Sequence, residues 1–183
     1  MIESGVELGE RAEVDRNEEV ASLFRRHYAP MCRLAYVILG DAGAAEEVVM
    51  EALVKTFSGW RRIKDLDRSE AYLKRAVVNG CRSKIRRKSI ESRAAVILRS
   101  QAQTSPFATD PDQRETRREM WAAIQMLPER QRAAVVLFYY EDLPEAEIAD
   151  ILQCSIGTVK SQLFKARAKL GRSLGLTDGG ADV

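Results

Sequence analysis

The sequence has little of the chemistry on which enzymes and metalloproteins depend. His27 is the only histidine, and the three cysteines, Cys32, Cys81 and Cys154, are odd in number and widely spaced. This spacing favours neither a zinc site nor a disulfide framework. There is also no glycine-rich phosphate loop and no pairing of a nucleophile with a base. We therefore expect no catalysis, no metal, no cofactor and no small-molecule substrate; Cys32 and Cys81 fit small core positions, and a redox role for Cys154 stays open.

Long apolar runs are missing as well. No run approaches the roughly 18 residues that a membrane-spanning helix needs, and the acidic first ten residues lack the basic and apolar regions of a signal peptide. No run alternates between apolar and polar residues as a half-buried strand does. The length of 183 residues, with 45% hydrophobic and 31% charged residues, is typical of a soluble globular protein with one domain or two small ones. We expect an all-α cytoplasmic protein that does not insert into a membrane.

The net charge of +2 conceals strongly charged blocks. Residues 61–88 contain eleven basic and three acidic residues, a net charge of +8. Residues 153–175 contain five basic residues and no acid, whereas residues 141–152 contain five acids and no base. Two basic blocks that lie far apart in the sequence predict two contacts with one polyanion.

Residues 145–170 are predicted to form two short helices joined by a tight turn, with Ser155 as the N-cap of the second helix. This layout is typical of a helix-turn-helix, whose second helix enters the major groove. An ordinary helical hairpin with a solvated basic face is the alternative, and the segregation of charge favours DNA binding. The expected buried positions are Ile148, Ala149, Leu152, Ile156, Val159, Leu163, Ala166 and Leu170.

The first half of the chain is predicted to contain three helices. The first runs from about Glu18 to Gly40, with Pro30 kinking or splitting it. The second spans residues 42–58 behind an Asp41 cap, and the third is capped by Ser69 and is basic along its length. The outer face of the second helix is acid-rich, and it fits either a plain solvated surface or a contact with a partner protein. The expected buried positions of the second and third helices are Ala45, Val48, Ala52, Leu53, Phe57, Leu73, Val77, Cys81 and Ile85.

Polar residues and prolines between the halves indicate a flexible linker, so we expect two small helical domains. The expected division is a mobile tail at 1–15, a domain at 16–99, a linker at 100–112, a domain at 113–175 and a tail at 176–183. The second domain opens with a helix from about Gln113, whose inward residues would be Met120, Trp121, Ile124 and Leu127. Pro128 ends that helix, and a further helix is expected from Glu129 to Tyr140.

The order of these parts resembles the extracytoplasmic-function (ECF, group IV) sigma factors, the small two-domain initiation subunits of bacterial RNA polymerase. In the first half the resemblance rests on residues 39–53, Phe57, Trp60, residues 71–79 and Arg86-Arg87. In the second half it rests on residues 127–137, Ile148-Ala149, Gly157-Thr-Val-Lys-Ser161 and Lys165-Ala-Arg167. The helix-turn-helix alone also fits response-regulator output domains. Its combination with the first-half pattern is far more specific.

This resemblance implies a two-part promoter reader that binds core RNA polymerase, melts promoter DNA and is held inactive by an anti-sigma protein. The sigma region 2-like domain would contact polymerase through Glu46, Glu47, Met50, Glu51 and Lys55. It would contact the minus-ten element through Lys64, Arg68, Tyr72, Lys74, Arg75, Asn79, Arg82, Arg86 and Arg87. The sigma region 4-like domain would contact the minus-thirty-five element through Ser155, Gly157, Thr158, Lys160, Ser161, Gln162, Lys165 and Arg167.

The sequence departs from the family pattern at four positions. Met50 stands where the family usually has glutamine, Lys84 near a usual acid, Gln153 where glycine is usual and Gln162 where arginine is usual. Met50 puts the detail of the polymerase contact in question, and Gln153 places a non-glycine residue in a turn that often needs positive φ. Gln162 suggests an altered promoter preference, since its amide can pair with adenine.

Two other functions remain as alternatives. A stand-alone helix-turn-helix regulator would bind its promoter tightly without polymerase. A helical interaction adaptor without a DNA role would tolerate charge reversal in both basic blocks.

Overall fold

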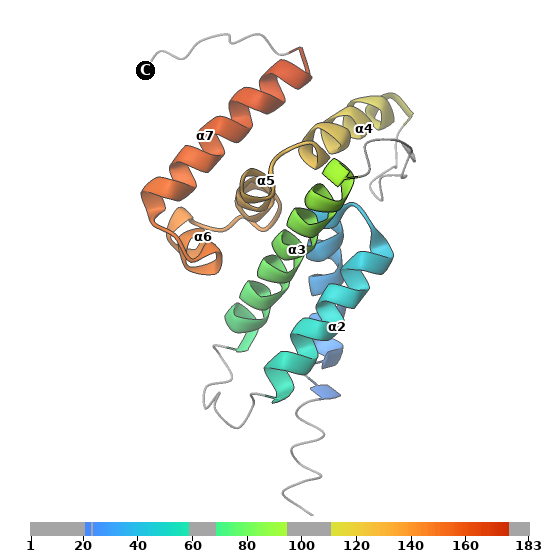
Figure 1. Cartoon of the computed structure of the whole chain (residues 1–183), viewed down its shortest axis with the longest axis vertical. Coiled ribbons are helices and arrows are strands. Elements are labelled where there is room, and N and C mark those ends of the chain that lie inside the picture. The colour runs from blue at the N-terminus through green and yellow to red at the C-terminus, as the bar shows by residue number, and fades with distance from the viewer. Residues whose placement is uncertain (1–20, 23, 59–68, 95–110, 176–183) are drawn as a thin grey trace, which may run out of the picture.

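The computed structural model describes residues 21–22, 24–58, 69–94 and 111–175, and in this part of the chain all regular structure is helical, as predicted. The first helix occupies residues 24–39. It is followed by α2 (Ala42–Ser58), α3 (Ser69–Ala94), α4 (Pro111–Gln125), α5 (Glu129–Val135), the π-helix η3 (Val136–Tyr140), α6 (Glu145–Leu152) and α7 (Ile156–Ser173). Figure 1 shows α3 in the middle, with α2 on one side and α5 and α6 on the other. None of the described helices is long and apolar enough to cross a bilayer.

The corner between the first helix and α2 has the expected capping residues. The helix continues through Pro30 without a break and ends at Gly40, whose amide donates to the carbonyl of Tyr36 at 2.7 Å. Gly40 has φ +72°, a left-handed conformation that glycine adopts without a Cβ clash. Asp41 then caps α2, because its carboxylate accepts a hydrogen bond from the amide of Ala44 at 2.9 Å.

The first half of the core lies between the first helix, α2 and α3. The predicted positions on α2, from Ala45 to Leu53, are buried, and Leu73, Val77 and Cys81 of α3 are buried as well. Close approach of α2 and α3 depends on Gly80, since a Cβ there would lie 2.8 Å from Cγ1 of Val48. The side chains of Phe57 and of the expected cap Ser69 lie outside the described set.

The helices of the second half differ from the prediction in three respects. The α4 helix begins at Pro111, inside the range expected for the linker. Met120 is 38% exposed, so its predicted inward position is wrong, whereas Ala123 and Leu127 are buried. The segment expected as one helix from Glu129 to Tyr140 widens into a π-helix at Val136, where the amide of Glu141 donates to the carbonyl of Val136 at 3.2 Å.

Both halves of the chain pack together. Their buried residues belong to one hydrophobic cluster, which extends from Met31 to Ala166. The α3 helix contacts both α5 and α6, and the ring of Tyr36 stacks on that of Trp121, with centroids 5.4 Å apart. The tails expected at 1–15 and 176–183 and most of the expected linker lie outside the described residues.

Candidate nucleic-acid and polymerase-binding surfaces

The turn of the helix-turn-helix is built by Gln153 and Ser155. Gln153 has φ +53° and ψ +53°, so a glutamine occupies the left-handed position where the family usually has glycine. Ser155 has extended backbone, and its hydroxyl accepts a hydrogen bond from the amide of Thr158 at 3.2 Å. The predicted N-cap is therefore confirmed. The two hydroxyl oxygens of Ser155 and Thr158 lie 2.9 Å apart, which fixes both side chains at the start of α7.

The two faces of α7 separate as the sequence predicts, with one exception. Val159, Leu163 and Ala166 are buried, but Ile156 is 46% exposed, so its predicted place in the core is wrong. Ile156 is the first residue of α7. Of the residues predicted to face DNA, Thr158 and Gln162 are half-buried. The others are exposed: Ser155, Gly157, Lys160, Ser161, Lys165 and Arg167.

Two bases of α7 are held by neighbours. Lys160 lies 3.7 Å from the carboxylate of Glu145 in an ion pair that is largely exposed. Arg167 donates a hydrogen bond from Nε to the hydroxyl of Tyr139 at 2.8 Å, and its guanidinium lies over the rings of Phe138 and Tyr139 at 5.6 and 5.7 Å. Such stacking orients an arginine while leaving its terminal nitrogens available to an anion.

The residues predicted to bind the minus-ten element divide into an open and a covered group. Tyr72, Arg86 and Arg87 are exposed on α3. Lys74 is covered by an ion pair with Glu141 at 2.8 Å, and Arg82 lies 3.8 Å from Glu129. Arg75 and Asn79 are half-buried in the same region. Lys64 and Arg68 lie outside the described residues.

Arg82 is largely buried, with 17% of its side chain exposed. Burial lowers the pKa of its guanidinium, and the carboxylate of Glu129 opposes that effect. Its Nη1 donates to the amide oxygen of Asn79 at 3.2 Å. The Nε atoms of Arg82 and Arg75 are buried without a hydrogen-bond partner, so two donors on this face are unsatisfied.

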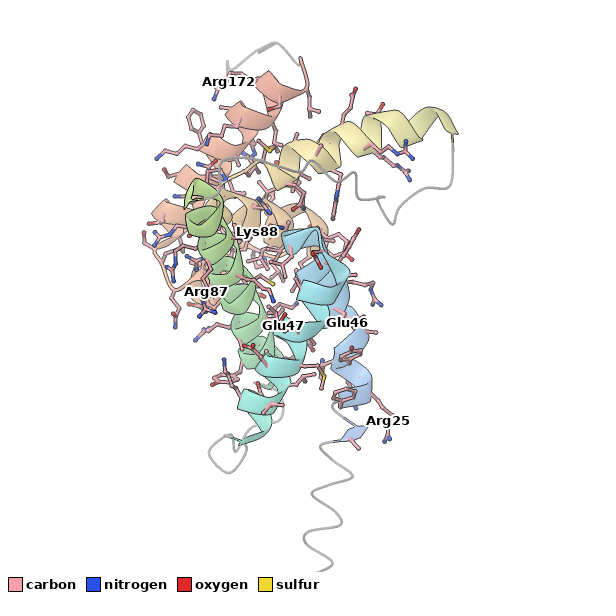
Figure 2. The ribbon with its side chains drawn as sticks, turned by 45° about the vertical axis from the view of Figure 1, so that its right-hand side comes forward. Arg25, Glu46, Glu47, Arg87, Lys88 and Arg172 are labelled. Atoms are coloured by element: carbon pink, nitrogen blue, oxygen red, sulfur yellow. The ribbon has the colours of Figure 1, made fainter. Side chains whose placement is uncertain are left out.

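The outer face of α2 is exposed as predicted, and Figure 2 labels Glu46 and Glu47 on it. Met50 is 43% exposed there, beside the exposed Glu51–Lys55 ion pair at 3.6 Å. Glu47 also forms a short ion pair with Lys84 of α3. The base at position 84 therefore bridges α2 and α3.

Sequence reasoning did not identify the role of Arg132. Its guanidinium donates to the carbonyls of Ile38 at 3.0 Å and Leu127 at 3.1 Å, and to the side-chain oxygen and the carbonyl of Gln125. Gln125 in turn donates to the carbonyl of Val37 at 3.0 Å. Burial lowers the pKa of Arg132 to about 10, which leaves it charged at neutral pH. The available signal was its spacing, since Arg132 falls four residues before Val136 on the apolar stripe of its helix.

The three cysteines occupy different environments. Cys81 is fully buried, and burial raises the pKa of its thiol to about 12, which makes it a poor nucleophile. Cys32 and Cys154 are half-buried, and neither forms a disulfide. In the described part of the chain no three histidine, cysteine or acidic side chains are grouped so that they could hold a metal ion.

Comparison with known proteins matches both halves to one family. Residues 23–90 match the model of Sigma-70 region 2, and residues 117–170 match that of Sigma-70, region 4. The chain is 31% identical over 161 residues to the ECF RNA polymerase sigma factor SigM of Mycobacterium tuberculosis, covering 88% of this chain and 80% of SigM. It is 29% identical over 156 residues to the RNA polymerase sigma-E factor of Streptomyces coelicolor, covering 85% of this chain and 86% of that protein.

The fold also matches a solved structure. The sigma factor RpoE of Bartonella quintana, crystallised in complex with the anti-sigma factor NepR, superposes with a TM-score of 0.67 at 20% identity, covering 87% of this chain and 99% of RpoE. In this chain the region 2 match precedes the region 4 match. The chain therefore belongs to the ECF sigma factors of the sigma-70 family.

Proposed function

We propose that this chain binds core RNA polymerase through α2 and reads a two-part promoter through α3 and α7. It would act in the cytoplasm as a group IV initiation factor without catalytic chemistry of its own. The observation that carries the proposal is the division of α7 into a buried face and a polar face. Val159, Leu163 and Ala166 anchor the helix, while Ser161 and Lys165 stay open to a ligand.

Within region 4, the polar face of α7 is the proposed minus-thirty-five contact. The α7 helix begins at Ile156 directly after its cap Ser155, and a helix N-terminus of this kind suits a phosphate. Lys165 and Arg167 add charge along the next two turns. Gln162 is the best candidate for reading a base, because a glutamine amide both donates and accepts.

Within region 2, the outer face of α2 is the proposed polymerase contact, and α3 is the proposed minus-ten contact. On α2, exposed carboxylates surround Met50, a combination of apolar and charged atoms typical of a protein interface. On α3, Tyr72 is 48% exposed and offers a ring on which an unstacked base can lie. We further propose that an anti-sigma protein binds this chain and holds it inactive, since its structural relative was crystallised in complex with an anti-sigma factor.

Run-off transcription tests this proposal. Purified chain is added to core polymerase with a library of promoter fragments, and transcripts are mapped. We expect a stable complex with core polymerase and initiation from a subset of fragments. Tight promoter binding without polymerase, and no transcript with it, would instead support a stand-alone regulator.

A further inference from the structure

We propose that this chain has an autoinhibited closed state, in which Glu129 and Glu141 of region 4 occupy the place of DNA phosphates on α3. The inference rests on the proposed function of α3 as the minus-ten contact. It concerns the chain alone, without an inhibitor protein. The closed state is the arrangement in which α5 and α6 lie against α3 on the side away from α2, as Figure 1 shows.

The first observation is the pairing of opposite charges at two points of α3. The Nζ atom of Lys74 lies 2.8 Å from the carboxylate of Glu141, and both side chains are less than one-fifth exposed. The guanidinium of Arg82 lies 3.8 Å from the carboxylate of Glu129, with 17% and 23% exposure. Lys74 and Arg82 are eight residues apart, about 12 Å along the helix axis. Two carboxylates therefore hold α3 at separate points, as two backbone phosphates would.

The second observation is that the closed state leaves hydrogen-bond donors without acceptors on the face of α3 that it covers. The Nε atoms of Arg75 and Arg82 are buried without an acceptor. A donor in that condition loses its hydrogen bond to water and gains none in return. A phosphate oxygen has the lone pairs to accept from a guanidinium, so bound DNA can satisfy donors that the region 4 carboxylates leave unpaired.

The third observation is a second set of contacts that makes closure specific. Arg132 and Gln125 donate to the carbonyls of Ile38 and Val37 at the end of the first helix, and Trp121 stacks on Tyr36. These bonds orient region 4 on region 2, and Glu129 and Glu141 then meet their partners on α3. Because the ion pairs retain some exposure, dissolved salt weakens them.

Closure leaves only part of the minus-ten surface available. Tyr72, Arg86 and Arg87 are open, whereas Lys74 and Arg82 are engaged by region 4. A ligand that needs the whole surface binds only the open fraction of molecules, so its apparent affinity falls by that fraction. The inference includes that core polymerase separates the two regions when it binds, so closure lowers its apparent affinity in the same way.

The test uses the full chain and a Glu129→Gln, Glu141→Gln double variant, which keeps side-chain shape and removes both charges. The matched control is Glu147→Gln, Asp150→Asn, which changes the net charge equally at two exposed acids of α6. Small-angle scattering from low to high salt measures closure, and titration with core polymerase measures its functional effect. Circular dichroism confirms that each variant is folded.

We expect the double variant to be more expanded than the parent and the control at low salt, and we expect this difference to shrink as salt rises. Salt weakens the two ion pairs, whereas the shared apolar packing of the two halves remains in every form. The apparent affinity of the double variant for core polymerase should rise about three- to tenfold, the effect of two partly exposed ion pairs on the closed fraction. A Lys74→Glu variant should also open the chain, and adding Glu141→Lys should close it again.

Identical scattering of the parent and the double variant at every salt concentration would overturn the closed state. Expansion without any gain in affinity for core polymerase would overturn autoinhibition. If no form binds core polymerase although scattering shows opening, the proposed function fails, and the inhibitory role fails with it.

Discussion

Arg132 donates a hydrogen bond from Nη1 to the carbonyl of Ile38, a residue 94 positions earlier, at 3.0 Å and so joins α5 to the first helix. The same guanidinium serves the carbonyls at the end of α4. A single buried cation thus satisfies the C-terminal ends of two helices, where the macrodipole favours positive charge.

Replacement of Arg132 by methionine is expected to lower the free energy of unfolding by about 2–3 kcal/mol, because buried carbonyls lose their donor. Urea unfolding followed by circular dichroism measures the change. Arg130→Met is the control, since Arg130 is 62% exposed and its loss should fall within about 0.5 kcal/mol of the parent. Equal losses at both positions would contradict the anchoring role of Arg132.

Gly80→Ala should destabilise the protein by about 1–2 kcal/mol, although alanine is normally the better helix former. The added methyl would lie 2.8 Å from Cγ1 of Val48, a β-branched side chain with little rotamer freedom. In a Val48→Ala background the same substitution should cost less. A double-mutant cycle by chemical denaturation measures this coupling, and strict additivity would exclude the contact as the cause.

Ser155→Ala is expected to cost about 1 kcal/mol, because the amide of Thr158 loses its acceptor at the start of α7. Ser155→Asp should retain most of the stability, since aspartate is an equally good cap. Thermal unfolding gives both values. Ser161→Ala, in the middle of the same helix, serves as the control for loss of a hydroxyl, and a comparable loss there would speak against capping.

Lys165→Gln should weaken DNA binding by the full chain and reduce the salt slope of the binding constant by about 1, the effect of one lost phosphate contact. Fluorescence anisotropy with a promoter fragment at several salt concentrations measures the slope. Arg118→Gln removes one charge from an exposed position of α4 and should leave the slope unchanged. If Lys165→Gln also left it unchanged, this face of α7 would not touch phosphate.

Glu51→Arg should lower the affinity for core polymerase about tenfold or more, because a like charge placed in a complementary interface costs several kcal/mol. The fold should tolerate the change, since Glu51 is 61% exposed and its pair with Lys55 adds little stability. Glu147→Arg on α6 makes the same change of charge away from the proposed contact. Biolayer interferometry with immobilised core polymerase compares the two, and equal affinities would remove α2 from the interface.

The helices and their capping residues could be predicted because their causes are local. The three-to-four spacing of apolar residues and the neighbouring cap residues predicted the bounds of α2, the Asp41 cap and the Ser155 cap. Periodicity was less informative at Ile156, which opens α7, and at Met120, in the second half of α4; both are more exposed than predicted. At such positions burial depends on which other elements pack nearby, and helical spacing alone does not contain this information.

The sequence predicted which residues form the candidate surfaces, but it did not predict which side chains those residues contact. The bases of α3 could be identified from sequence, yet their pairing with Glu129 and Glu141 joins residues more than 40 positions apart. The same holds for Arg167, whose orientation depends on Tyr139, 28 residues earlier. Such contacts follow from the packing of the two halves, which no local pattern encodes.

Tyr139, which accepts the hydrogen bond from Arg167, lies within the π-helix Val136–Tyr140. A π turn carries roughly one residue more than an α turn, so it rotates the following side chains by about 100° relative to an uninterrupted α-helix. Deleting a single residue between Val136 and Tyr140 would reset this phase and turn the aromatic rings away from Arg167. The segment is thus a point where chain length, rather than side-chain chemistry, determines how α7 presents its arginine.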